Sequence, residues 1–220
     1  MPLQAVLFDM DGVIVNTEPL HKKAFYKVFG NLGIHVSSEF YASFMGSSTK
    51  NVVNKLVNEF SLDMSQEKIL SEKRKYFKYF FDTEEGFSLL PGVKDLIETY
   101  HEAGITLVLA SSASKSSIEW VFDKFDLHPY FKDKISGESL QESKPHPEIF
   151  EIAARRSGTP KKNCMVIEDS TNGIKAARKA GIFCAAYSSN FNHGQDYSLA
   201  NIVVENFSSL KPEKLKKYFD

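Results

Sequence analysis

The sequence predicts an α/β fold: a doubly wound, Rossmann-like parallel sheet with a small α-helical cap domain inserted near its start. Two observations support this class. Short apolar runs alternate with helical stretches from about residue 91 onward, and a long helical block separates the first apolar run from the others. Alternation of strands and helices is typical of a parallel sheet with helices on both faces.

Six short apolar runs are expected to form the strands. In sequence order they are Ala5–Phe8, Ile105–Ala110, a weak Lys134–Ser136, Cys164–Ile167, Phe183–Tyr187 and Ile202–Val204. Helical spacing fills the intervals between the later runs. Pro147 suits the first position of the helix that follows it, and Gly181 suits the end of a helix that begins at Thr171.

Residues 16–87 interrupt this alternation. They carry helical patterns over 21–32, 49–59 and 66–81 and no convincing strand, and the α/β pattern resumes at 90–93. The sequence therefore predicts a helical cap at 16–87 and an α/β core formed by 1–15 together with 88–220. A single extended helical arm packed on the core is the alternative interpretation.

The composition is that of an ordinary globular protein. Among 220 residues, 27 basic and 28 acidic side chains nearly cancel, so no overall field favours nucleic acid or an anionic membrane. No run approaches the ~18 apolar residues of a transmembrane helix, and no signal-like segment precedes the first strand. Cys164 and Cys184 lie in apolar runs, which favours buried thiols in a reducing compartment. We expect a cytoplasmic monomer that binds neither nucleic acid nor membrane.

Polar residues follow four apolar segments where a parallel sheet would present its carboxyl ends. Each has an ordinary structural explanation as a turn residue, a helix cap or a solvated charge. Ligands of open parallel sheets bind beyond the carboxyl ends of the strands, so the convergence of these residues favours a shared site. They are Asp9 and Asp11, Ser111 and Ser112, Lys144, and Glu168 with Asp169.

The acidic members of this set predict a magnesium site. Asp9 and Asp11 lie two residues apart at a strand end and project to the same side of the backbone. Mg²⁺ takes oxygen ligands and bridges carboxylates to phosphate. Asp9, Asp169 and the backbone carbonyl of Asp11 are the expected ligands, and Glu168 is expected to bind through water or to orient another ligand.

The same residues can carry out phosphoryl transfer. A free oxygen of Asp9 would attack phosphorus and form an aspartyl phosphate. Asp11 would protonate the departing oxygen and later deprotonate the attacking water. Ser111 and nearby backbone N–H groups would bind the phosphoryl oxygens, while Lys144 would offset their charge. These roles predict a Mg²⁺-dependent phosphatase that acts on a small phosphate monoester.

The ordered motifs resemble those of the haloacid dehalogenase superfamily. The matching residues are Asp9-Met10-Asp11-Gly12-Val13, Ser111, Lys144-Pro145 and Glu168-Asp169-Ser170. The sequences of residues 143–150 and 172–177 are similar to those of the branch that contains the phosphosugar phosphatases and β-phosphoglucomutase. The resemblance implies Mg²⁺, an aspartyl phosphate and substrate selection by a helical cap. It does not imply dehalogenation, because members with Asp at the position of Asp11 are phosphoryl-transfer enzymes.

Substrate contacts in the cap follow only from this resemblance. Two residues near the cap's start match the hinge threonine and histidine of β-phosphoglucomutase, and a lysine matches one that holds the distal phosphate. A Gly-Ser-Ser-Thr loop corresponds to the cap loop of the family. The expected substrate-binding residues are Thr17, His21, Gly46, Ser48 and Lys75 in the cap and Ser112 in the core.

Three functions remain in competition. The mutase, which interconverts β-glucose 1-phosphate and glucose 6-phosphate, has an arginine where this chain has Thr49, and threonine cannot bind a phosphate bidentately. A phosphatase acting on a sugar phosphate is therefore favoured. A non-catalytic phosphate-sensing protein is the third hypothesis. Asp11 argues against it, because a long-lived phospho-signal needs no catalyst of its own hydrolysis.

Overall fold

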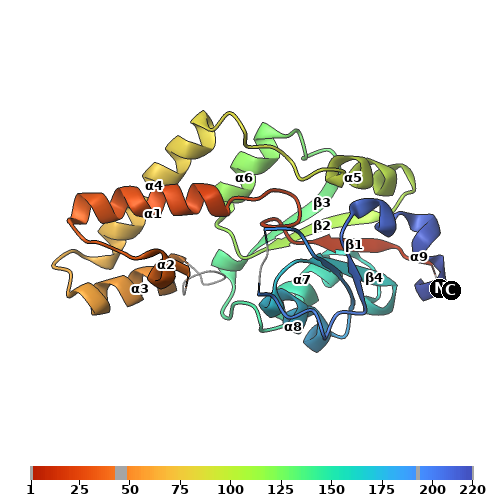
Figure 1. Ribbon diagram of the computed structural model, residues 1–220. Coiled ribbons are helices and arrows are strands. Elements are labelled where there is room, and N and C mark those ends of the chain that lie inside the picture. Colours follow the sequence, from red (N-terminus) through yellow and green to blue (C-terminus); the bar gives the residue numbers. More distant parts are fainter. Residues whose placement is uncertain (1, 43–48, 192–193, 220) are drawn as a thin grey trace. The chain divides into compact units, whose positions relative to one another are not determined.

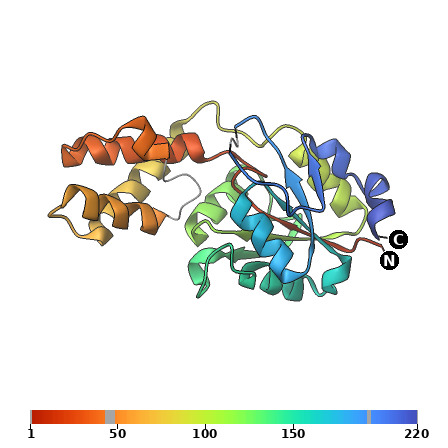
Figure 2. The same cartoon turned by 60° about the horizontal axis from the view of Figure 1, so that its bottom comes forward.

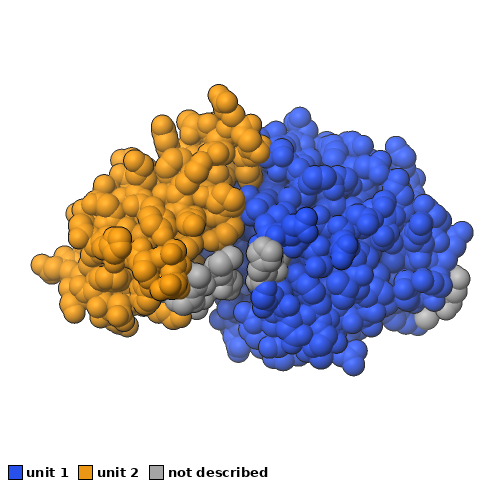
Figure 3. Space-filling model, viewed as in Figure 1, with its two compact units in different colours: residues 1–16, 88–220 blue, residues 17–87 orange. Residues whose placement is uncertain are grey.

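The computed structural model describes residues 2–42, 49–191 and 194–219. The chain forms two compact units, which are coloured separately in Figure 3. Unit 1 comprises residues 1–16 and 88–220, and unit 2 comprises residues 17–87. Asn16, which the sequence placed in the helical insertion, belongs to unit 1.

Within the described residues, unit 1 is built on a six-stranded sheet whose neighbouring strands all run parallel. The spatial order is β3-β2-β1-β4-β5-β6. This architecture confirms the α/β class expected from the sequence. The strands are β1 (Ala5–Phe8), β2 (Thr106–Ser111), β3 (Phe131–Ser136), β4 (Cys164–Glu168), β5 (Phe183–Tyr187) and β6 (Ile202–Val204).

The position of β1 between β2 and β4 determines where Asp9 lies. Phe8 pairs with Leu109 of β2 on one side and with Ile167 of β4 on the other. All four residues of β1 are buried, because helices cover both faces. Asp9 therefore emerges between the carboxyl ends of two neighbouring strands, where ligands of parallel sheets bind.

Helices cover the two faces of the sheet, as Figures 1 and 2 show. On one face, α7 (Glu148–Ser157) and α8 (Thr171–Ala180) pack in one cluster with alternate strand residues, including Leu7 and Val166. The other face carries α5 (Val93–Glu102), α6 (Lys115–Lys124) and α9 (Pro212–Phe219). There the Phe8 ring meets Tyr100 and Phe131, with centroids 6.3 and 5.7 Å away. Burial of each such ring stabilises the fold by about 1.5–3 kcal/mol.

The strand β3 begins three residues earlier than the sequence predicts. Its first half, Phe131-Lys132-Asp133, carries two charges and lacks an apolar run. An edge strand tolerates such residues because one side of it has no neighbouring strand. Among the described residues, β3 pairs only with β2.

Unit 2 consists of the helices α1 (Glu18–Leu32), α2 (Ser38–Ala42), α3 (Thr49–Phe60) and α4 (Gln66–Thr83) within the described residues. Pro19 occupies the first turn of α1, and Gly33 ends it with a φ of 66°. Ser65 caps α4 by accepting a hydrogen bond from the backbone N–H of Lys68. The core of this unit is aromatic and aliphatic and includes Phe25 and Phe29. The sequence did not predict α2, because its five residues are too few to show a helical period.

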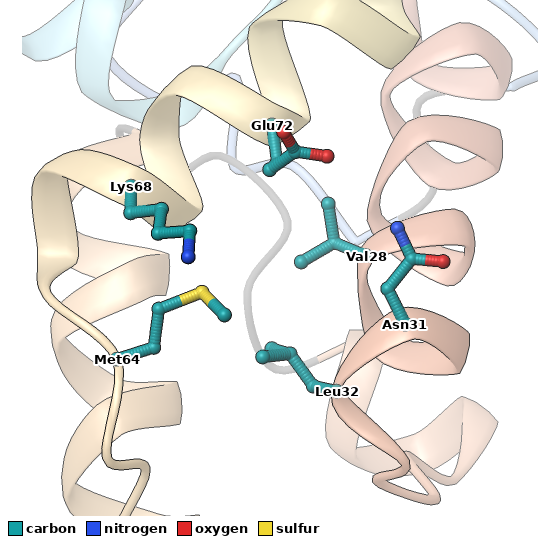
Figure 4. Close-up of a pocket in the computed structure, with 6 residues that line it drawn as sticks. All are labelled: Val28, Asn31, Leu32, Met64, Lys68 and Glu72. Carbon is teal, nitrogen blue, oxygen red and sulfur yellow. The ribbon is translucent and has the colours of Figure 1, made fainter.

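A small pocket lies inside unit 2, between α1 and the start of α4 (Figure 4). Its volume is about 210 Å³. The residues that line it are Val28, Asn31, Leu32, Met64, Lys68 and Glu72. None of them is among the substrate-binding residues expected from the sequence.

No helix in the described part of the chain combines the length and the hydropathy required to cross a membrane.

Candidate active site

The turn after β1 presents Asp9, a buried carboxylate, at the end of the strand. Four backbone hydrogen bonds close this turn, among them Gly12 N–H to Val15 O at 2.7 Å. Gly12 has a φ of 85°, and a Cβ there would lie 1.9 Å from Asp169 Oδ2. A side chain at this position would be strained and would also displace Asp169, so glycine is required.

Lys144 places a buried ammonium beside Asp9. Its Nζ donates to Asp9 Oδ1, to Glu168 Oε1 at 2.9 Å and to Ala110 O at 3.0 Å. The ammonium also lies 4.9 Å from the centre of the Phe150 ring. Three acceptors and an aromatic face thus compensate for the water that this charge has lost.

Glu168 is engaged through both carboxylate oxygens and is only 1% exposed. Oε1 accepts from Lys144, while Oε2 accepts from Asp169 N at 2.8 Å, Ser170 N at 2.7 Å and Ser170 Oγ at 2.9 Å. The sequence interpretation gave Glu168 a place among the metal ligands. In the structure its hydrogen bonds hold Lys144 and the start of α8.

Three acidic residues form a cluster at this end of the sheet. Ligand oxygens of Asp9, Glu168 and Asp169 all lie within 4.8 Å of one another. Burial raises the pKa of Asp9 to about 7, and the Lys144 charge opposes this rise. Burial and the neighbouring carboxylates raise the pKa of Asp169 well above its ordinary range. For Lys144, burial favours the neutral amine, but Asp9 and Glu168 outweigh it and raise the pKa.

This donor set fits a hard divalent cation. One ammonium cannot balance three buried carboxylates, and the two positive charges of a divalent cation would keep all of them ionised. The donors are oxygens, which suits Mg²⁺ better than a softer metal. Asp11 lies close enough that its charge contributes to the raised pKa of Asp9.

Ser111 ends β2, next to the strand that carries Asp9. Its side chain is buried, and its Oγ accepts a hydrogen bond from Ala113 N at 3.1 Å. The carbonyl of the preceding Ala110 accepts from Lys144. One strand thus carries the Ser111 hydroxyl and, on the preceding residue, a carbonyl that holds the Lys144 ammonium. Ser112, by contrast, is exposed.

The substrate-binding residues expected within 17–87 differ in their exposure to solvent. Thr17 is buried, and its carbonyl accepts from the backbone N–H groups of Leu20 and His21 at the start of α1. Lys75 is exposed on α4. Gly46 and Ser48 lie outside the described residues, so the structure places neither of them.

Lys73 is a buried residue of unit 2 that the sequence analysis did not include among the site residues. It is 4% exposed, and its Nζ lies 2.5 Å from His21 Nδ1 and 3.4 Å from Thr49 Oγ1. The His21 ring stacks on Phe77 with centroids 4.4 Å apart. The signal for Lys73 was present, because it falls four residues before Phe77 on the apolar stripe of α4.

The chain is similar in sequence to known proteins. Residues 6–187 match the family model of the haloacid dehalogenase-like hydrolases. Hexitol phosphatase B of Escherichia coli O157:H7 is 30% identical over 234 aligned positions, which cover 96% of each chain. The resemblance stated from the sequence motifs is thereby confirmed.

Solved structures extend the similarity to the whole fold. β-Phosphoglucomutase from Clostridium difficile has 27% identity and a TM-score of 0.82, covering 100% of this chain and 97% of that one. A variant of CbbY from Rhodobacter sphaeroides, in complex with xylulose 1,5-bisphosphate, has 26% identity and a TM-score of 0.86. That alignment covers 94% of this chain and 96% of the CbbY chain.

Gly173→Ala tests the packing of Glu168 on α8. The new Cβ would lie 1.6 Å from Glu168 Oε1, so the carboxylate must leave Lys144. We expect the free energy of unfolding to fall by about 3 kcal/mol in urea denaturation, because a buried ion pair is disrupted. Gly30→Ala, in α1, is the matched control: its Cβ meets no atom within 4 Å, and the helix should gain about 0.4–1 kcal/mol. Equal effects of the two substitutions would contradict this packing.

His21→Gln tests the charge arrangement inside unit 2. Burial, assisted by Lys73, lowers the pKa of His21 well below 6.5, so the folded state keeps the ring neutral. The unfolded chain binds a proton as the pH falls below about 6.5, and the native protein loses up to about 1.4 kcal/mol per pH unit there. We expect His21→Gln to flatten this decline between pH 6.5 and 5 in urea titrations. His35→Gln is the control for loss of an exposed imidazole; an unchanged slope in His21→Gln would refute the assignment.

Proposed function

We propose that this chain, which belongs to the haloacid dehalogenase-like hydrolase family, is a Mg²⁺-dependent phosphatase acting on a small sugar phosphate. One observation carries the proposal. A buried ammonium, that of Lys144, contacts the carboxylate of Asp9 at the carboxyl end of the central strand. A nucleophile and a fixed positive charge side by side suit attack on an anionic phosphate ester.

In the proposed first step, a carboxylate oxygen of Asp9 forms a bond to phosphorus while the bond from phosphorus to the ester oxygen breaks. Asp11 gives a proton to that oxygen, so the sugar leaves as an alcohol. In the second step, Asp11 takes a proton from water, and the water oxygen attacks phosphorus. The bond between phosphorus and the Asp9 oxygen breaks at the same time, which regenerates the Asp9 carboxylate and releases inorganic phosphate. The net reaction consumes one ester and one water and forms one alcohol and one phosphate.

The remaining residues support these steps. Lys144 offsets the charge of the transferring phosphoryl group, and the Ser111 hydroxyl donates to one of its oxygens. Asp9, Asp169 and the Asp11 carbonyl are the residues that would hold Mg²⁺. When bound, the ion supplies positive charge that reduces repulsion between phosphate and carboxylates. Glu168 keeps Lys144 in position.

A sugar phosphate is the substrate class that the relatives favour. Their names or bound molecules refer to a hexitol phosphate, a phosphoglucose and xylulose 1,5-bisphosphate. Thr17, His21, Gly46, Ser48 and Lys75 remain the proposed cap contacts to substrate, with Ser112 from the core. Lys73 would support this set by holding His21, because its buried ammonium lies against His21 and Thr49.

Two substitutions test the covalent mechanism. In a phosphate-release screen over sugar phosphates with Mg²⁺, Asp9→Asn should reduce the rate to background because the nucleophile is lost. Asp11→Asn should lower kcat by about 10²–10⁴-fold, the usual value of acid–base catalysis. Asp63→Asn, an exposed aspartate of unit 2, is the control. More than a few per cent of wild-type activity in Asp9→Asn would exclude Asp9 as the nucleophile.

The mutase is the alternative function, because the β-phosphoglucomutase structure matches over the whole chain. A mutase must retain a bisphosphate through reorientation, and Thr49 contributes a hydroxyl rather than a guanidinium. We expect wild-type protein supplied with β-glucose 1-phosphate and a trace of the 1,6-bisphosphate to release phosphate faster than it forms glucose 6-phosphate. Coupled assays measure both products. Faster glucose 6-phosphate formation would establish the mutase instead.

Thr49→Arg provides a second test of the choice between phosphatase and mutase. An arginine binds phosphate bidentately, so the affinity for bisphosphorylated sugars should rise by about 10-fold, as measured by competitive inhibition. Thr49→Gln is the control for side-chain length without charge. An arginine that gives no more affinity than glutamine would show that residue 49 does not meet the second phosphate.

A further inference from the structure

We propose that Ser136 and Glu138, at the carboxyl end of β3, are positioning residues that hold the phosphate-binding segment 111–115. The proposal rests on the proposed function, in which Ser111 donates to a phosphoryl oxygen. Neither residue is expected to touch the substrate. Their contacts reach the segment from the neighbouring strand, which lies beside β2 in Figure 1.

Ser136 is the first of these contacts. It lies opposite Ser111 in the pairing of β2 with β3 and is 5% exposed. Its Oγ donates to Ala113 O at 2.6 Å and accepts from Glu138 N at 3.2 Å. The hydroxyl is thus used as donor and acceptor at once, which fixes its orientation. A buried, fully used hydroxyl holds its partner in one position.

Ala113 is held at both of its backbone polar groups. Its N–H is donated to Ser111 Oγ, and its carbonyl accepts from Ser136. Since the Ser111 oxygen accepts the Ala113 N–H, the Ser111 hydroxyl keeps its own proton for donation. Ser136 therefore acts on the Ser111 hydroxyl through one intervening residue.

Glu138 is the second contact. Its Oε2 accepts from the backbone N–H of Lys115, the first residue of α6, at 3.1 Å. The capping residue Ser114 accepts from Ser117 N, so the two acceptors serve different N–H groups of the first turn. A carboxylate at this end of a helix is favourable, because the N-terminal N–H groups carry partial positive charge.

Gly137, between these two residues, lets the backbone after β3 approach the backbone after β2 closely. A Cβ at Gly137 would lie 3.0 Å from the Cα of Ser112. Residues 136–138 thus contact segment 112–115 at three successive points: a hydroxyl, a bare backbone and a carboxylate. Phosphate binding by a hydroxyl and backbone N–H groups depends on donors that are already in place.

Two pairs of variants separate positioning from general stability. Ser136→Ala removes the hydroxyl, whereas Ser136→Thr keeps it. Glu138→Ala removes the acceptor of the Lys115 N–H, whereas Glu138→Gln keeps an acceptor oxygen. Ser139→Ala, an exposed serine of the same turn, is the matched control. Glu138 is exposed, so its variants should fold even if a change at Ser136 does not.

Steady-state kinetics with a sugar phosphate and inhibition by inorganic phosphate supply the first readout. We expect Ser136→Ala to raise both KM and the inhibition constant of phosphate by about 3–10-fold, the effect of one hydrogen bond. Glu138→Ala should have a smaller effect in the same direction. Threonine at 136 and glutamine at 138 should restore values within about 2-fold of wild type.

Amide hydrogen exchange of residues 111–117 is the second readout and needs no activity. Exchange there should accelerate in Ser136→Ala and Glu138→Ala and remain at the wild-type rate in the Ser139 control. If the alanine variants changed only the melting temperature, with exchange, KM and phosphate inhibition unaltered, the positioning role would be overturned. If the wild-type protein were inactive on every ester, the proposed function would be refuted. The exchange comparison would still decide whether Ser136 and Glu138 hold segment 111–115.

Discussion

The ammonium of Lys144 is buried between the carboxylates of Asp9 and Glu168, and the geometry of the site depends on this contact. Removing buried charges from water costs several kcal/mol per ion unless partners compensate closely. The three charged groups come from the end of β1, from the segment before α7 and from the end of β4. Loss of one partner would leave an uncompensated buried charge, at a cost of about 3–5 kcal/mol.

Small residues make this arrangement sterically possible. Gly12 leaves room for Asp169, and Gly173 leaves room for Glu168. The result is a cluster with more negative than positive charge in a buried place. Such a cluster is poorly compensated in isolation and well suited to a divalent cation and an anionic substrate bound together. The carboxylates that these glycines accommodate therefore belong to the cluster to which we assign the chemistry.

The sequence predicts the sheet, the family and the residues at the strand ends, because apolar runs and local motifs carry that information. It is less informative where tertiary neighbours decide the outcome. In the run of three charges on α4, the phase of the helix buries Lys73 and exposes Lys75. Ser136 becomes relevant only through the register that sets it opposite Ser111. The hydrogen bonds of Glu168 to Lys144 and Ser170 likewise cannot be read from the motif.

Direct identification of the phosphorylated residue tests the central claim that Asp9 is the nucleophile. The Asp11→Asn protein, in which hydrolysis of the intermediate should be slow, would be mixed with Mg²⁺ and a sugar phosphate, quenched, and reduced with borohydride. Reduction converts an aspartyl phosphate to homoserine, which peptide mass spectrometry locates. The account predicts homoserine at position 9 and none in protein that also carries Asp9→Asn. Modification at another aspartate, or at none while phosphate is still released, would contradict it.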